Sequence, residues 1–188
     1  MGFNIVRSVA VAFAMRQLRR KDSYSPAAQA QLEEAWEESL AASAMCFVIA
    51  KRFTRLNPDQ ALLTGLLHVI GRLYIVMRSK DMAELDDAAM RGVVDGWHAT
   101  IGKAILESWE LPETLQHAVE HQDELEIEQD GDVSMTDVLI AAKLLAKKET
   151  DGTRFPALRR LGLVSADGTS PMDPHADELR NVRSSLSD

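Results

Sequence analysis

The chain has a single cysteine, Cys46, so no intrachain disulfide can form. The absence of a disulfide framework is typical of proteins that work in a reducing cytoplasm, and we expect that location. Cys46 lies inside the apolar run Ala44–Val48. We therefore expect its side chain to be a small buried hydrophobic group and not a reactive thiol.

Long apolar runs and an excess of positive charge are missing too. No run of about 18 apolar residues occurs, so we expect no membrane-spanning helix and no membrane partner. Ile5–Met15 is apolar, but Arg7 interrupts it and the basic residues follow it, the reverse of a signal peptide. The net charge of −8 argues against DNA as a partner. The basic cluster behind this segment is expected to be a solvated helix end; it consists of Arg16, Arg19, Arg20 and Lys21.

Residues that alternate between apolar and polar, the pattern of a half-buried strand, are also absent. Apolar residues recur instead at helical spacing, so the sequence predicts an all-α protein with no significant β-sheet. Hydrophobic residues make up 46% of the 188 residues, enough for one packed domain over residues 1–188. The expected helices cover residues 6–20, 26 to beyond 47, 58–77, 97–109, 112–124, 134–148 and a short stretch from 173 that frays over 184–188.

The expected helices begin at capping residues. Ser25 and Asn57 each precede a proline, and Ser134 opens a capping box in which Asp137 replaces the usual glutamate. Apolar stripes run along the two longest helices and indicate their buried faces. The first stripe is Leu32, Trp36, Leu40, Ser43 and Phe47, and the second is Leu62, Leu66, Ile70, Leu73 and Met77.

Three stretches are too polar or too rich in turn residues for core helices: 81–87, 123–132 and 151–168. The middle stretch is expected to be an exposed loop because it concentrates negative charge. Its six acidic residues are Asp123, Glu124, Glu126, Glu128, Asp130 and Asp132.

The second apolar stripe contains Gly65 and Gly71, which each cost up to about 1 kcal/mol relative to alanine, so we expect close helix approach there. The segment Gly65–Leu73 reads GLLHVIGRL and resembles the GLLHDIGKL signature of the HD superfamily of metal-dependent phosphohydrolases. The superfamily's His-Asp pair, in which both residues bind the metal, is His68-Val69 here. An isopropyl group has no lone pair and cannot bind a metal.

Further segments resemble, in the same order, the HDOD (HD-related output) domain of bacterial signalling proteins; they are residues 36–44, 59–68, 98–112, 115–121 and 142–146. The resemblance covers about residues 6–148 and implies a compact orthogonal helical bundle of HD-superfamily type. Residues 149–188 would then form a turn-rich C-terminal segment with a short helix. HDOD domains usually carry a further helical subdomain upstream, which the resemblance implies is absent here unless the chain is a fragment.

The resemblance also implies that the metal site of the superfamily is largely replaced. Its first histidine corresponds to Glu38, the aspartate of the central pair to Val69, and a late helical aspartate to Lys143. A protonated lysine cannot ligate a metal and repels a divalent cation. We therefore expect no metal and no other cofactor.

His68 and His98 match the family pattern, and its tandem histidines correspond to Gln122 and Asp123, or to His121 after a one-residue slip. Two interpretations stay open: hydrogen-bonded interior histidines, or a residual metal site. The residual site would use Glu38, His68, His98 and His121 or Asp123. His117 lies one helical turn before His121, which suits either a two-point ligand or two ordinary, partly exposed histidines.

Three functions of different classes follow from the resemblance. The preferred one is a non-catalytic bacterial signal-transduction or regulatory module that acts through protein–protein contact. The alternatives are a divergent metal-dependent phosphohydrolase and a nucleotide-binding sensor in which Lys143 contacts a phosphate. The expected partners are signalling proteins, or a second copy of the chain bound through the apolar face of Ile5–Met15.

Overall fold

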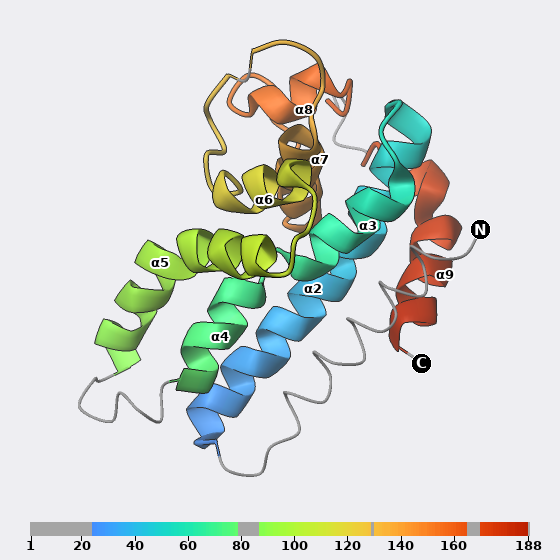
Figure 1. Ribbon diagram of the computed structural model, residues 1–188. Coiled ribbons are helices and arrows are strands. Elements are labelled where there is room, and N and C mark those ends of the chain that lie inside the picture. The colour runs from blue at the N-terminus through green and yellow to red at the C-terminus, as the bar shows by residue number, and fades with distance from the viewer. Residues whose placement is uncertain (1–23, 79–86, 129, 165–169, 188) are drawn as a thin grey trace.

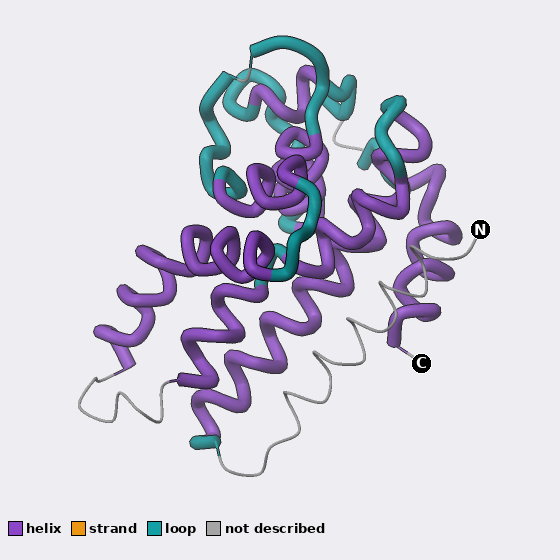
Figure 2. The backbone as a smooth tube through the Cα atoms, viewed as in Figure 1, coloured by secondary structure: helices purple, strands orange, loops and turns teal. Residues whose placement is uncertain are grey.

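The structure is a computed structural model that describes residues 24–78, 87–128, 130–164 and 170–187. Within these ranges all regular secondary structure is helical, which confirms the predicted all-α class (Figure 2). The helix expected over residues 6–20 and the basic cluster after it lie outside the described residues. The elements are α2 (Pro26–Phe53), α3 (Pro58–Leu67), α4 (Ile70–Arg78), α5 (Asp87–Ser108), α6 (Glu113–Glu120), α7 (Met135–Ala146), α8 (Pro156–Arg160), a 3-10 turn η2 (Asp173–His175) and α9 (Ala176–Ser187).

Helix α2 runs through the middle of the bundle and organises it. It begins at Ser25, whose hydroxyl accepts a hydrogen bond from the Ala28 backbone amide, as the sequence predicts. Helices α3 and α4 pack along one side of α2, with α5 against α4, and α9 packs along the other side (Figure 1). Helix α7 packs on α2 and α6, and α8 packs against α7 (Figure 1).

The predicted single helix over residues 58–77 is wrong, because the chain turns at His68 and Val69 and separates α3 from α4. Helix α3 packs mainly on α2, whereas α4 packs mainly on α5 and also contacts α2. The carbonyl of His68 at the break accepts a hydrogen bond of 3.1 Å from the side-chain amide of Gln122. The turn is therefore compensated by a side chain from another part of the fold.

Close backbone contacts at two glycines confirm the expected helix approach. A Cβ atom at Gly65 would lie 2.6 Å from the Cα atom of Ser43 on α2. A Cβ atom at Gly71 would lie 1.9 Å from the backbone oxygen of His98 on α5. Any side chain at either position would force the helices apart, so these glycines set the spacing around the intervening His68.

Other helix boundaries also differ from the sequence prediction. Helix α5 begins at Asp87 and not near residue 97, because Met90 and Val94 extend its buried face. Helix α6 ends at Glu120, four residues early. The stretch over 151–168 contains α8, and α9 stays helical through Ser187 where fraying was expected. Burial of Leu186 against the core accounts for the ordered end of α9.

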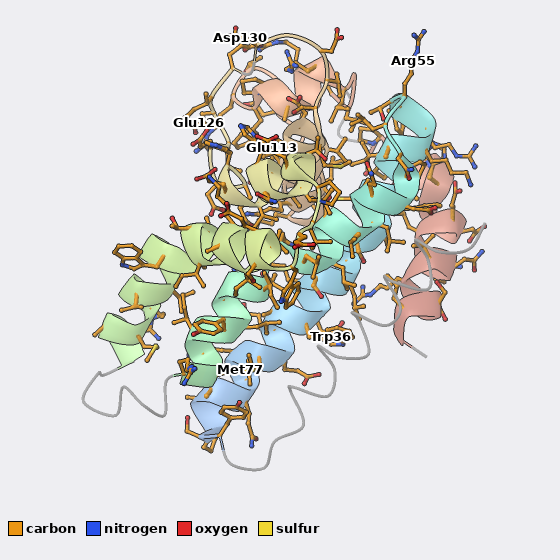
Figure 3. All side chains as sticks on the ribbon, viewed as in Figure 1. Trp36, Arg55, Met77, Glu113, Glu126 and Asp130 are labelled. Carbon is orange, nitrogen blue, oxygen red and sulfur yellow. The ribbon has the colours of Figure 1, made fainter. Side chains whose placement is uncertain are left out.

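The acidic loop is exposed, as predicted, but arginines from α8 and the residues before it hold it in place. Arg154 donates to Glu126 at 2.7 Å, and Arg159 pairs with Glu128. Figure 3 shows Glu126 and Asp130 at the periphery, near α8. The capping box of Ser134 and Asp137 at the start of α7 is present.

Buried side chains form two apolar clusters. The first cluster joins the N-terminal half of α2 to α3, α4, α5 and α6. The second joins the C-terminal half of α2 to α7, α8 and the residues before α9, and it contains the free thiol of Cys46. Burial raises the pKa of that thiol, in agreement with a packing role.

The stretch Pro58–Arg78, which spans α3 and α4, is long and apolar enough to cross a membrane by length and composition alone. Its mean hydropathy reaches 1.4, whereas the sequence predicted no apolar run long enough to span a membrane. However, 72% of the window is buried inside the bundle, and core helices of this kind pass the same test.

Candidate functional site

A network of polar side chains brings most of the predicted site positions together. Six elements contribute: α2, the turn between α3 and α4, α4, α5, the turn after α6, and α7. Each side chain of the network contacts at least one other member. The network thereby connects helices of the first apolar cluster to α7, which belongs to the second apolar cluster. Its members are Glu38, His68, Arg72, His98, Gln122, Asp123 and Lys143.

His68 lies at the centre of this network and is only 2% exposed. Its Nδ1 atom lies 2.6 Å from the carbonyl oxygen of Gly65 and donates to it, which leaves Nε2 with a lone pair. Nε2 lies 3.7 Å from Oε1 of Glu38 and has no hydrogen-bond partner among the described residues. Burial lowers the pKa of His68, so its ring is neutral at pH 7.

Glu38 forms an ion pair with Arg72, whose Nη1 atom lies 2.7 Å from Oε2 of the carboxylate. Burial by itself raises the pKa of Glu38, but the polar surroundings of its carboxylate, among them the charges of Arg72 and Lys143, outweigh burial and lower the pKa to about 2. Arg72 was missed in the sequence. Its position one helical turn after His68 is a signal that could have placed it beside the site.

Asp123 links α5 to α7. Its Oδ2 atom lies 2.9 Å from Nε2 of His98, and its Oδ1 atom lies 2.7 Å from the ammonium of Lys143. Burial raises the pKa of Asp123, but the hydrogen bond from His98 and the charge of Lys143 dominate and hold it below its usual range. Asp123 is therefore a carboxylate bound on both oxygens.

The ammonium of Lys143 points into the site and not to solvent, with 9% of its side chain exposed. It donates to Asp123 and to two oxygens of Gln122, the side-chain oxygen at 3.1 Å and the backbone oxygen at 3.2 Å. Burial lowers the pKa of Lys143, and the nearby carboxylates of Asp123 and Glu38 oppose that shift. Three acceptors thus match the three N–H groups of the ammonium.

Two further predicted positions lie elsewhere. Val69 packs in the first apolar cluster and is 1% exposed. His121 bonds to Glu124 at 2.7 Å through Nδ1, and its ring lies against the ring of His117. Asp123, and not His121, is thus the residue after α6 that reaches His98.

The side chains around His68 do not fit a divalent metal as they stand. No three His, Cys, Asp or Glu side chains in the described part of the chain are grouped to hold such an ion. His68 alone is oriented as a ligand, with Nδ1 held by a carbonyl and Nε2 free. The Lys143 ammonium already binds Asp123, and its charge would repel a metal.

A cavity of about 470 Å³ opens beside this network. One wall carries the acids Glu34, Glu37 and Glu38, the others carry the bases Arg72, Lys143 and Lys147, and the rest is Ala41, Ala42 and Ala146. Since acids and bases balance in number, the cavity has no formal net charge to attract an anion.

The HDOD domain family model matches residues 1–125 of this chain. No curated protein matches it at a significant level.

Several solved structures share its fold. The "Putative metal-dependent phosphohydrolase" of Shewanella amazonensis SB2B gives a TM-score of 0.73 at 24% identity, over 96% of this chain and 68% of that one. The "Putative signal transduction protein" of Marinobacter aquaeolei VT8 gives 0.64 at 17% identity, over 99% of this chain and 44% of that one. An HDOD domain protein with unknown function from Geobacter sulfurreducens gives a TM-score of 0.63 at 17% identity, over 100% of this chain and 71% of that one.

Proposed function

Because this chain belongs to the HDOD domain family, we propose that it is a non-catalytic signal-transduction module that regulates other proteins by direct contact. The observation that carries the proposal is the Lys143 ammonium bound to Asp123, inside the region where a hydrolase would need a metal. Val69 supports it, since its isopropyl group is buried among apolar residues and cannot act as a ligand. The site then serves as a structural centre.

The expected partners are other signalling proteins in the cytoplasm, with no role for DNA or a membrane. A second copy of the chain, bound through the apolar face of Ile5–Met15, is the other candidate; this segment lies outside the described residues. The net charge of −8 disfavours nucleic acid, in agreement with a protein partner.

A metal analysis combined with an activity screen tests the proposal. We expect purified protein to contain no stoichiometric zinc, manganese or iron and to hydrolyse no nucleotide or phosphate ester in the presence of added metal. Turnover that disappears on His68→Gln substitution, with an unchanged melting temperature, would contradict it.

One observation favours the second candidate, a divergent phosphohydrolase. Nε2 of His68 is buried with a free lone pair, and the fold is shared with the Shewanella protein named above. A metal bound near His68 would activate water for attack on a phosphate ester. Stoichiometric metal together with turnover would favour this candidate over the first.

The third candidate, a nucleotide-binding sensor, rests on the bases Arg72, Lys143 and Lys147 around the cavity, whose charge the acids of the opposite wall balance. Thermal-shift measurements with cyclic dinucleotides and mononucleotides test it. A ligand at 100 times its dissociation constant adds about 2.7 kcal/mol to the unfolding free energy, which such a screen detects easily.

A further inference from the structure

Lys143 is the buried cation of the polar network, and its contacts have the character of a built site. Its three hydrogen-bond acceptors come from Gln122 and Asp123, which follow α6, while the lysine itself is on α7. Asp123 in turn binds His98 on α5. A single ammonium thus connects the turn after α6 to α7 directly, and α5 to α7 through one carboxylate.

The side-chain amide of Gln122 extends this connection to the break between α3 and α4. Its oxygen accepts from Lys143, and its nitrogen donates to the carbonyl of His68. The amide is therefore oriented by both partners, and loss of the ammonium would leave its buried oxygen without a donor from α7. The ammonium thus acts on the position of His68 through one intermediate group.

The charges of the network also balance once the Lys143 ammonium is included. The network contains two carboxylates, Glu38 and Asp123, and Arg72 neutralises the first of them. Lys143 neutralises the second and is close enough to Glu38 to favour its ionised form. With the ammonium in place, the network needs no further positive charge.

We propose that the Lys143 ammonium is the resident cation of this site: it cross-links α5, the turn after α6 and α7, and so occupies the position and supplies the charge that a divalent metal would otherwise provide. The site is therefore complete without a metal. The inference concerns the architecture of the site and does not rest on the regulatory function. Metal-free hydrolysis by the unmodified chain would overturn that function and leave the role of Lys143 standing.

The first part of the test removes the charge. Lys143→Met keeps a long unbranched side chain in the same space but removes the ammonium. We expect its melting temperature to fall by about 5 °C or more, since about 1 kcal/mol corresponds to about 2–4 °C in a protein of this size.

Lys147→Met is the matched control, because Lys147 is the next lysine on the same cavity wall and makes no contact with Asp123 in the described structure. It should shift the melting temperature by less than about 1 °C. Equal shifts for the two variants would overturn the proposal.

The second part asks whether a metal can replace the ammonium. Lys143→Asp removes the ammonium and puts a shorter, carboxylate-bearing side chain on the face of α7 that carries Lys143 toward Asp123. We expect millimolar zinc or manganese to raise its melting temperature by about 5 °C or more relative to a chelator, and to leave the unmodified chain and Lys147→Met within about 1 °C. Stabilisation of the unmodified chain by the same amount would show that Lys143 is not its resident cation. If Lys143→Asp folds only with metal, as followed by circular dichroism, the proposal holds. If it folds under neither condition, or folds with no response to metal, the proposal fails.

Discussion

At the scale of single residues, the chain keeps a histidine in its core at a cost. Nε2 of His68 is buried without a described partner, and an unsatisfied buried polar atom costs about 1–3 kcal/mol. Glu38 is the nearest group that could stabilise a proton there, at 3.7 Å. The neutral ring is retained because burial opposes its charge more strongly than this carboxylate favours it.

The same residue makes stability depend on pH. The pKa of His68 is lowered by folding, so as pH falls below about 6.5 the unfolded chain takes up a proton before the folded chain does, and the unfolding free energy decreases. A further decrease of about 1–2 kcal/mol is expected below about pH 4.5, where the unfolded chain protonates Glu38 while the folded chain keeps it ionised down to about pH 2. Part of the full effect is lost because this carboxylate keeps some of its hydration.

Urea melts between about pH 2.5 and pH 7.5 measure both effects. His68→Gln should flatten the curve above pH 5 but keep the fall below it. His175→Gln, on η2 and outside the network, is the control for loss of an imidazole, and its curve should keep the fall that His68 causes. A curve for His68→Gln as steep as that of the unmodified chain above pH 5 would show that another group titrates there.

At the scale of secondary structure elements, the break between α3 and α4 positions the site. Gly65 and Gly71 stand on either side of it, and each allows a different helix to approach. His68 lies between these two close contacts, so its ring position depends on both of them. The glycines are therefore retained for packing, despite their low helix propensity.

Gly71→Ala should destabilise the fold by about 3 kcal/mol or more, because its Cβ would overlap the backbone oxygen of His98, which cannot move as a flexible side chain can. Gly92→Ala and Gly96→Ala on α5 are the controls, since a Cβ there meets no atom within 4 Å in the described structure. These two should be neutral or stabilise by up to about 1 kcal/mol. Chemical denaturation measures the unfolding free energy of all three variants. If Gly71→Ala costs no more than the two control substitutions, α4 and α5 do not pack as closely as described.

Leu66 tests whether α3 is central to the bundle. Its side chain is fully buried in the first apolar cluster, so Leu66→Ala should lower the unfolding free energy by about 2–5 kcal/mol. Leu62, one turn earlier and only partly buried, is the control and should cost less on the same substitution. A cost below about 1 kcal/mol for Leu66 would mean that α3 is peripheral.

At the scale of the whole molecule, α9 is attached differently from the other helices. It packs on α2, where Glu178 accepts from Lys51 and Arg52, and Arg183 pairs with Glu37. Few of its side chains are buried. Charge pairs thus add to the apolar contacts of Leu179 and Leu186 in holding α9, and charge pairs near solvent weaken in salt.

Glu178→Gln should therefore increase hydrogen exchange of the α9 amides about two- to fivefold, which corresponds to a loss of about 0.5–1 kcal/mol in the local opening free energy. Asp177→Asn makes the same charge change one residue earlier, where the carboxylate forms an ion pair with Arg180 of the same helix, and it should have little effect. Raising the salt from about 0.05 M to 0.5 M should produce a similar increase in the unmodified chain. Exchange that is insensitive to both salt and Glu178→Gln would mean that apolar packing holds α9.

The sequence by itself determined the local structure of this protein. The caps at Ser25, Asn57 and Ser134 are formed by side chains within three residues of the amides they bind, so they can be predicted from short windows. The all-α class can be predicted for the same reason, because apolar residues recur at helical spacing within short windows of the sequence. The close approach at Gly65 and Gly71 could be expected because glycine within an apolar helix needs a compensating contact.

Only the tertiary structure decided how the site is assembled. Lys143 meets Asp123 across 20 positions of the chain, Arg72 meets Glu38 across 34, and Gln122 meets the His68 carbonyl across 54. No local periodicity encodes which of these side chains face each other, because that depends on how α5, α6 and α7 are packed. The break at His68 and Val69 has the same origin: the apolar stripe through it continues without interruption, and contacts with two different helices turn the chain there.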